Sequence, residues 1–92
     1  MTEVPVLVTT LHRGVFFGFA PSKEATKSKA SIRLFRVRNC IRWSGVIGGF
    51  LGLAKSGPNS DCKIGSEAPE VLLHDITSVT YCTDEAVASW TA

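Results

Sequence analysis

The chain has 92 residues, of which 45% are hydrophobic and 20% charged, and its net charge is +2. This composition fits one globular domain over residues 1–92 and excludes a disordered chain, because apolar residues are plentiful and the net charge is small. The longest uncharged run, residues 43–54, holds 12 residues. A transmembrane helix needs roughly 20, so we expect no membrane span. No basic segment followed by an apolar stretch begins the chain, so we expect no secretory signal.

The first half of the chain predicts strands. Residues 4–11 are β-branched and apolar and indicate a strand, with Pro5 near its start. Residues 15–20 follow a tight link and predict a second strand, in which Gly18 marks a bulge or a sharp bend. The polar segment 21–30 is rich in Ser, Thr and Lys and predicts an exposed, mobile hairpin loop.

A third strand is predicted over residues 31–43, where apolar and basic positions alternate. The apolar positions are expected to share the face on the core: Phe35, Val37, Ile41 and Trp43. The basic positions are expected to share the other face: Arg36, Arg38 and Arg42. Arginine presents a planar, permanently charged fork that suits phosphate or carboxylate, so these three residues are the predicted ligand- or partner-binding site. The alternative is a solvated strand face whose charges discourage edge-to-edge pairing.

Glycines dominate the start of the second half. Five of the eight glycines lie within residues 44–57. Apolar residues at helical spacing predict a short glycine-rich helix over residues 46–55, and Gly57 and Pro58 are expected to end it. Neither the Gly-x-Gly-x-x-Gly pattern nor the Walker pattern is present. The glycines are therefore expected to allow close backbone approach or a conformational change.

The remainder of the chain predicts a loop, strand segments and a final helix. Residues 58–69 read as a loop, and residues 70–82 predict one long strand or two, because the parity of the apolar positions changes near His74 and Asp75. Thr83 is expected to cap a C-terminal helix with acids in its first turn. Together these elements predict an α+β fold: a small, strongly bent antiparallel sheet or open β-barrel with a short glycine-rich helix and a C-terminal helix.

Charge is divided unevenly along the chain. Residues 13–42 carry eight basic residues and one acid, a balance of +7, whereas residues 43–92 carry two basic residues and six acids, a balance of −4. Three interpretations follow. The basic half could be a surface for phosphates, or the halves could be complementary faces that meet in a homo-oligomer. The third is that the fold mixes the halves, so that the asymmetry cancels in space.

The thiols and imidazoles do not form a recognisable site. Three cysteines, an odd and widely spaced set, predict free thiols in a reducing cytoplasm: Cys40, Cys62 and Cys82. A zinc site could draw on these cysteines together with His12 and His74, but no Cys-x-x-Cys or His-x-x-x-His pair supports it. We therefore predict no metal and no cofactor. No catalytic motif is visible either, so we predict that the protein is not an enzyme.

The second half of the chain carries a series of distinctive short segments. They are Trp43-Ser-Gly, Gly49-Phe-Leu-Gly-Leu-Ala, Ser56-Gly-Pro, Cys62-Lys-Ile-Gly, Ala68-Pro, residues 72–79 and Thr83-Asp-Glu-Ala, with Gly14-Val-Phe-Phe-Gly in the first half. With them, most of the chain resembles an uncharacterised family of small phage and prophage proteins, a domain of unknown function. The resemblance implies a phage-encoded protein that acts in the cytoplasm of a bacterial host or is built into the virion.

Three functions are consistent with these observations. The first is a non-enzymatic phage accessory protein, expected as a homo-oligomer, that binds a host or phage protein or a phosphate-bearing ligand. It would act by steric or sequestering action, for example against host defence. The alternative is a structural virion protein, such as a capsid decoration or tail component. The third is a nucleic-acid binder, whose affinity would fall steeply with salt. A nucleotide stays open as a ligand, and no membrane partner is expected.

Overall fold

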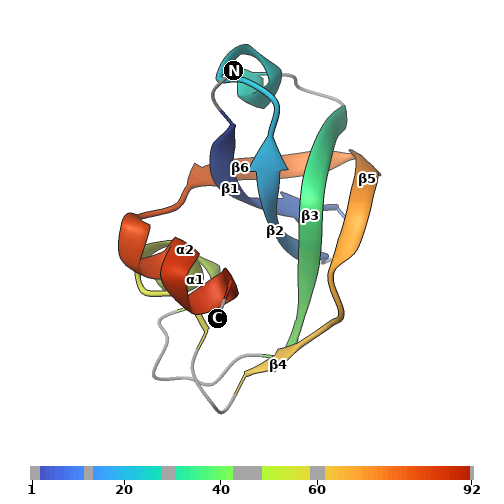
Figure 1. Ribbon diagram of the computed structural model, residues 1–92. Coiled ribbons are helices and arrows are strands. Elements are labelled where there is room, and N and C mark those ends of the chain that lie inside the picture. Colours follow the sequence, from blue (N-terminus) through green and yellow to red (C-terminus); the bar gives the residue numbers. More distant parts are fainter. Residues whose placement is uncertain (1–2, 12–13, 28–30, 43–48, 59–61, 92) are drawn as a thin grey trace.

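The computed structural model describes residues 3–11, 14–27, 31–42, 49–58 and 62–91 (Figure 1). The elements in chain order are β1 (Val4–Thr10), β2 (Val15–Ala20), the 3-10 helix η1 (Glu24–Lys27), β3 (Ser31–Arg42), α1 (Gly49–Lys55), β4 (Lys63–Ile64), β5 (Ala68–His74), β6 (Ile76–Tyr81) and α2 (Asp84–Thr91). The α+β class is as predicted. Neither α-helix in the described ranges is long and apolar enough to cross a bilayer.

The strands form one antiparallel sheet that is not closed. The order is β4-β3-β2-β1-β6, and β5 pairs with β3 beside this path. The first half of β3 pairs with β5, from Ser31 to Val37, and its C-terminal end pairs with the short β4. β3 therefore pairs with three other strands, β2, β4 and β5.

A first apolar core lies on one face of the sheet, which we call the inner face. Its buried members come from four strands: Val6, Val8, Ala20, Ile32, Leu34, Val37 and Leu73. Ile76 and Val79 of β6 pack against the same cluster as Leu73 of β5. Because β5 and β6 stand at the two sides of the strand order, a shared core requires the sheet to curl. The chain turns between them at Asp75, whose φ is +56°.

A second core joins the opposite face, which we call the helix face, to α1 and α2. The Phe17 and Trp90 rings are stacked with centroids 5.0 Å apart. Trp90 is completely buried, and its indole N–H donates to the carbonyl oxygen of Leu53 in α1 at 3.1 Å. The two helices thus pack against each other and against one half of the helix face, as Figure 1 shows.

Local signals in the sequence predicted the start of α2 and the end of α1. The hydroxyl of Thr83 accepts a hydrogen bond from the Ala86 N–H at 3.1 Å, so Thr83 caps α2 as predicted. Gly57 follows α1 with φ +80°, a conformation that glycine adopts without strain. The predicted helix over residues 46–55 is found as α1, and its first three positions lie outside the described residues.

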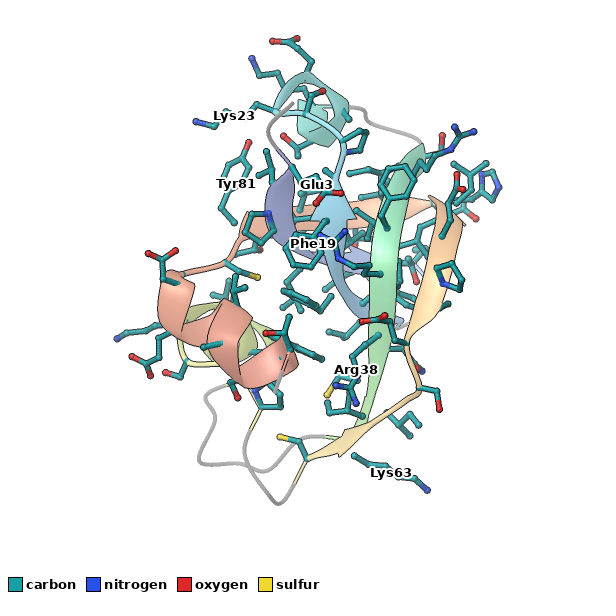
Figure 2. The ribbon with its side chains drawn as sticks, in the orientation of Figure 1. Glu3, Phe19, Lys23, Arg38, Lys63 and Tyr81 are labelled. Atoms are coloured by element: carbon teal, nitrogen blue, oxygen red, sulfur yellow. The ribbon has the colours of Figure 1, made fainter. Side chains whose placement is uncertain are left out.

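The two predicted loops contain more structure than expected. Segment 21–30 was predicted as an exposed, mobile hairpin loop, and residues 22–24 and 27 are exposed. Residues 24–27, however, form η1, in which Thr26 is buried and shares a hydrogen bond with the Tyr81 hydroxyl at 2.8 Å. Lys23 lies over the Tyr81 ring, as Figure 2 shows. Segment 58–69 holds β4 and the start of β5. Both corrections have one cause: tertiary contacts order short polar segments that local propensity leaves open.

The irregularity expected at Gly18 is present, but the extra residue lies in the neighbouring strand. Between Phe17 and Phe19 the pairing partner changes from Arg38 to Phe35, so β3 uses one residue more than β2. Arg36, at φ +51°, is the residue in the left-handed conformation. Gly18 has another role, because a Cβ there would lie only 3.0 Å from the Leu34 Cβ.

Candidate functional site

The bulge in β3 changes which side chains share a face. Val37 is buried in the inner core, whereas Phe35 lies opposite Phe19 on the helix face. The prediction that Phe35 and Val37 share a face is therefore wrong, because the extra residue shifts the alternation by one. Ile41 was predicted in the core and is 55% exposed, whereas its neighbour Cys40 is buried in the helix-face core. Trp43, predicted with them, lies outside the described residues.

Arg36 lies on the part of the helix face beside Phe19. Its guanidinium carbon is 4.2 Å from the Phe19 ring centroid. Its Nη2 is 2.6 Å from Oε1 of Glu3, and Nη1 donates to Oε2 of the same carboxylate at 3.3 Å. Figure 2 shows Glu3 and Phe19 together in front of β2. We call Glu3, Phe19 and Arg36 the Arg36 site; 46% of the Arg36 side chain is exposed.

The Arg36 guanidinium carries a permanent charge in this setting. The hydrogen bond that Arg36 donates to the Glu3 carboxylate raises the pKa of Arg36, with burial as a weaker opposing effect and the charges of Glu3 and Glu67 as further contributions. The ring of Phe19 offers its negative face to the cation, which adds a cation–π attraction. The site is thus a cation on an aromatic base with one carboxylate attached, an arrangement that can hold an anion.

The backbone of Arg36 is strained. A φ of +51° lies in the left-handed region, which costs an L-residue other than glycine roughly 1–2 kcal/mol. Asparagine and aspartate tolerate this conformation better than arginine does. β-Bulges with such residues redirect side chains, and this one directs the Arg36 side chain over Phe19. The conformation of Arg36, the residue at the centre of the Arg36 site, thus lowers the stability of the fold.

Arg38, two residues further along β3, is bound in a different way. Its Nε donates to the carbonyl oxygen of Gly65 at 3.1 Å, and its Nη1 donates to that of Trp90 at 3.0 Å. It therefore connects β3 with the chain after β4 and with the last turn of α2, where the helix dipole favours a positive charge. The labelled side chain lies beside the lower part of β3 in Figure 2. Arg38 is a structural clamp in this geometry.

The structure describes the side chains of two of the three predicted arginines, and their environments differ. Arg36 and Arg38 share the helix face, as expected, but Arg38 has its guanidinium bound to main-chain carbonyls. The backbone of Arg42 ends β3 opposite Lys63, and its side chain lies outside the described part of the structure. Of the two predicted site residues whose side chains the structure describes, Arg36 is the one whose guanidinium is not bound to main-chain carbonyls, so it is the candidate contact.

Two further described basic side chains, Arg33 and Lys27, are paired with acids of the same chain. Arg33 Nε lies 3.0 Å from Oε2 of Glu70, which joins the basic and acidic halves across β3 and β5. Lys27 lies 3.5 Å from Glu24 within η1. The interpretation in which the fold mixes the two halves therefore gains support from Arg33 and Glu70. The same ion pair argues against the interpretation that a broad basic surface is the basis of function.

The cysteines gather around the helix-face core. Cys40 belongs to it, and Cys62 and Cys82 pack against it; none of the three is in a disulfide. Burial raises the pKa of Cys82 to about 12. Within the described ranges, no group of three His, Cys, Asp or Glu side chains is placed to hold a metal. His12, considered as a zinc ligand, lies outside these ranges.

Two members of the Arg36 site were not predicted. Glu3 is separated from Arg36 by 33 positions, and no local pattern links them. Phe19 was placed in the predicted second strand, which the structure has as β2, but its contact with a guanidinium was not expected. The available signal was the pairing of the second and third strands, which places Phe19 opposite Phe35 and next to Arg36.

Comparison with known proteins identifies one family. The model of the domain of unknown function DUF6948 matches residues 3–90, which include all six strands and most of α2. The match therefore covers every residue of the Arg36 site. No curated protein and no solved structure is significantly similar to the chain.

Proposed function

The chain belongs to the family of the domain of unknown function DUF6948, a description that assigns no function, and we therefore propose a function from the Arg36 site itself. The protein is a non-enzymatic binding protein whose Arg36 contacts an anionic group of its partner. The partner is a host or phage protein or a phosphate-bearing ligand, and the action is steric or sequestering. We include two further points in this proposal: the protein is phage-encoded and acts in a bacterial cytoplasm, and it forms a homo-oligomer. Light scattering tests the oligomeric state.

One observation carries the proposal: Arg36 is strained and yet exposed. Its φ is +51°, its guanidinium lies 4.2 Å from the Phe19 ring, and nearly half of its side chain is open to solvent. An exposed ion pair returns little free energy, with measured values of about 0.2–1 kcal/mol. A strained backbone that returns little stability supports a role in binding. Arginine beside an aromatic ring is also a frequent centre of protein interfaces.

The geometry narrows the candidate site. Arg38 serves the fold through Gly65 and Trp90, so it is not part of the proposed contact. Arg33 is paired with Glu70 and supplies a matched control in the same strand. Because several described cations already contact acceptors of this chain, the nucleic-acid alternative, which needs a row of free cations, is less favoured. The alternative, a structural virion protein, is tested by measuring how abundant the protein is in purified particles.

Affinity capture with matched variants tests the proposal. Immobilised wild-type protein, Arg36→Gln and Arg33→Gln are exposed to a bacterial lysate, and bound molecules are identified by mass spectrometry. We expect a partner retained by wild type and Arg33→Gln and lost from Arg36→Gln. Binding that survives Arg36→Gln contradicts the proposal. Bound material with excess 260 nm absorbance and a steep salt dependence would favour nucleic acid, and abundant protein in purified particles would favour the virion alternative.

A further inference from the structure

The Arg36 site already holds a carboxylate, and that carboxylate comes from the edge of the fold. Glu3 binds both terminal nitrogens of the guanidinium, at 2.6 and 3.3 Å. It precedes β1, whose pairing with β2 begins at Val4. Moving Glu3 away from Arg36 therefore breaks no strand pairing. A third of the Glu3 side chain is exposed, so an incoming ligand can reach it.

The charges around the site match a single negative charge. Two acids act on Arg36: Glu3, which pairs with it, and Glu67, whose charge is close enough to raise the pKa of Arg36. With Glu3 moved away, Glu67 is the one that stays. A carboxylate that replaces Glu3 restores the original balance. A phosphate monoester carries about −1.5 to −2 at neutral pH and would add repulsion from Glu67.

An apolar row flanks the guanidinium. Pro5, Phe19 and Phe35 lie opposite one another on β1, β2 and β3, and each is half-buried. Their uncovered surface suits apolar side chains on both sides of an acidic residue. A sugar–phosphate chain offers no matching apolar groups apart from its bases. The row therefore favours a polypeptide as the source of the anion.

We infer that the partner is a protein that presents an Asp or Glu carboxylate between apolar side chains, and that this carboxylate displaces Glu3 from Arg36. The inference rests on the proposed function and specifies its ligand. Glu3 acts as an internal competitor, which lowers the affinity of the free site for weak or non-specific anions. A cognate surface overcomes this competition because it adds apolar contacts with Phe19 and Phe35 that a free anion lacks.

The test uses blocked tripeptides that differ in one side chain. Acetyl-Leu-Glu-Leu-amide, the matching phosphoserine peptide and the matching glutamine peptide are titrated into isotope-labelled protein at constant ionic strength, and the Arg36 Nε–H resonance is followed. The proteins are wild type, Glu3→Gln and, as a matched control, Glu24→Gln, which removes the carboxylate of an exposed ion pair in η1. The backbone spectrum of each variant confirms its fold.

We expect Glu3→Gln to bind the glutamate peptide at least fivefold more tightly than wild type does, and the phosphoserine peptide no more tightly than the glutamate peptide. Glu24→Gln should behave as wild type, and the glutamine peptide should not bind. Equal affinities for Glu3→Gln and wild type, or tighter binding of phosphoserine, overturn the inference while leaving an anion contact at Arg36. If neither anionic peptide shifts the Arg36 resonance in Glu3→Gln, the proposed function fails as well.

Discussion

Arg36 and Arg38 lie two residues apart in one strand and on one face of the sheet, yet their environments differ completely. Arg38 is half-buried beside the helices and donates to the carbonyl oxygens of Gly65 and Trp90. Arg36 lies over the half-buried Phe19 with a single carboxylate as its partner. The difference shows that the charge pattern of a strand does not define a binding surface. The packing of the other elements decides which charge stays available.

The boundary between the two regions runs between two aromatic rings. Phe17 is almost fully buried and stacks on Trp90, whereas Phe19 meets Phe17 edge to face, with ring centroids 5.3 Å apart, and is covered by Arg36. The α-helices cover the part of the helix face at Phe17 and leave the part at Phe19 to Arg36. Substitutions on the two sides of this boundary should therefore have different consequences. On the side of Phe17 they should lower stability, and on the side of Phe19 they should abolish binding.

The largest effect is expected for Trp90→Ala in the covered region. The substitution removes a fully buried ring, its stack on Phe17 and its hydrogen bond to Leu53, so the free energy of unfolding should fall by about 3–5 kcal/mol. Urea titration followed by circular dichroism measures the change. Phe19→Ala, in the uncovered region, should cost clearly less. Equal losses for both substitutions would contradict the proposed boundary.

A smaller loss of stability is expected for Arg38→Met. Methionine keeps much of the apolar stem but leaves the carbonyl oxygens of Gly65 and Trp90 without this donor, at a cost of about 1–3 kcal/mol. Hydrogen exchange should become faster in the last turn of α2, and partner capture should persist in the folded variant. Arg36→Met is the matched control and should change exchange in α2 little. The clamp would be disproved by unchanged protection of α2 in Arg38→Met.

Elements with strong local signals were predicted well. The β-branched segment at residues 4–11, the second strand and the Thr83 cap carry their information in neighbouring residues, and the structure has β1, β2 and α2 at these places. β3 covers residues 31–42 of the strand predicted over 31–43, and Trp43 lies outside the described residues. Asp75, where apolar parity changes, is the corner between β5 and β6. In each case propensity and packing favour the same conformation.

The bulge at Arg36 could not be predicted from its own residues. Segment 35–38 alternates without interruption, and arginine gives no indication of a left-handed backbone. The contact with Glu3 and the binding of Arg38 to Trp90 depend on chain segments that are distant in sequence. The sequence therefore indicated arginine as the relevant residue type on β3, whereas the three-dimensional packing selects which arginine is available.

A pH-dependent effect of intermediate size is expected at Cys82. Burial raises the pKa of its thiol to about 12, from 9.0 in the absence of the protein environment. The folded state therefore holds this proton more tightly than the unfolded state, and the Cys82 contribution to stability is present below about pH 9 and is lost as the pH rises towards 12.

Alkylation by iodoacetamide at pH 8.5, followed peptide by peptide, measures the same property of Cys82. Because the thiolate is the reactive form, Cys82 should react more than tenfold more slowly in the folded protein than in urea. In Cys82→Ala the fall in stability between pH 9 and 12 should be reduced. A folded-state rate equal to the unfolded rate would show that the thiol is not shielded.

The smallest change in stability is expected for Arg36→Asn, although it should abolish binding. Asparagine tolerates φ +51°, so relief of roughly 1–2 kcal/mol of backbone strain offsets the lost contacts with Glu3 and Phe19, and the free energy of unfolding should stay within about 1 kcal/mol of wild type. Arg36→Val is the matched control, because it removes the same guanidinium but keeps a side chain that disfavours this conformation. It should be less stable than Arg36→Asn by about 1–2 kcal/mol. Both variants should lose the partner in the capture experiment. If Asn and Val give equal stabilities, the backbone at this position is not strained, and the reason for assigning Arg36 to binding rather than to the fold disappears.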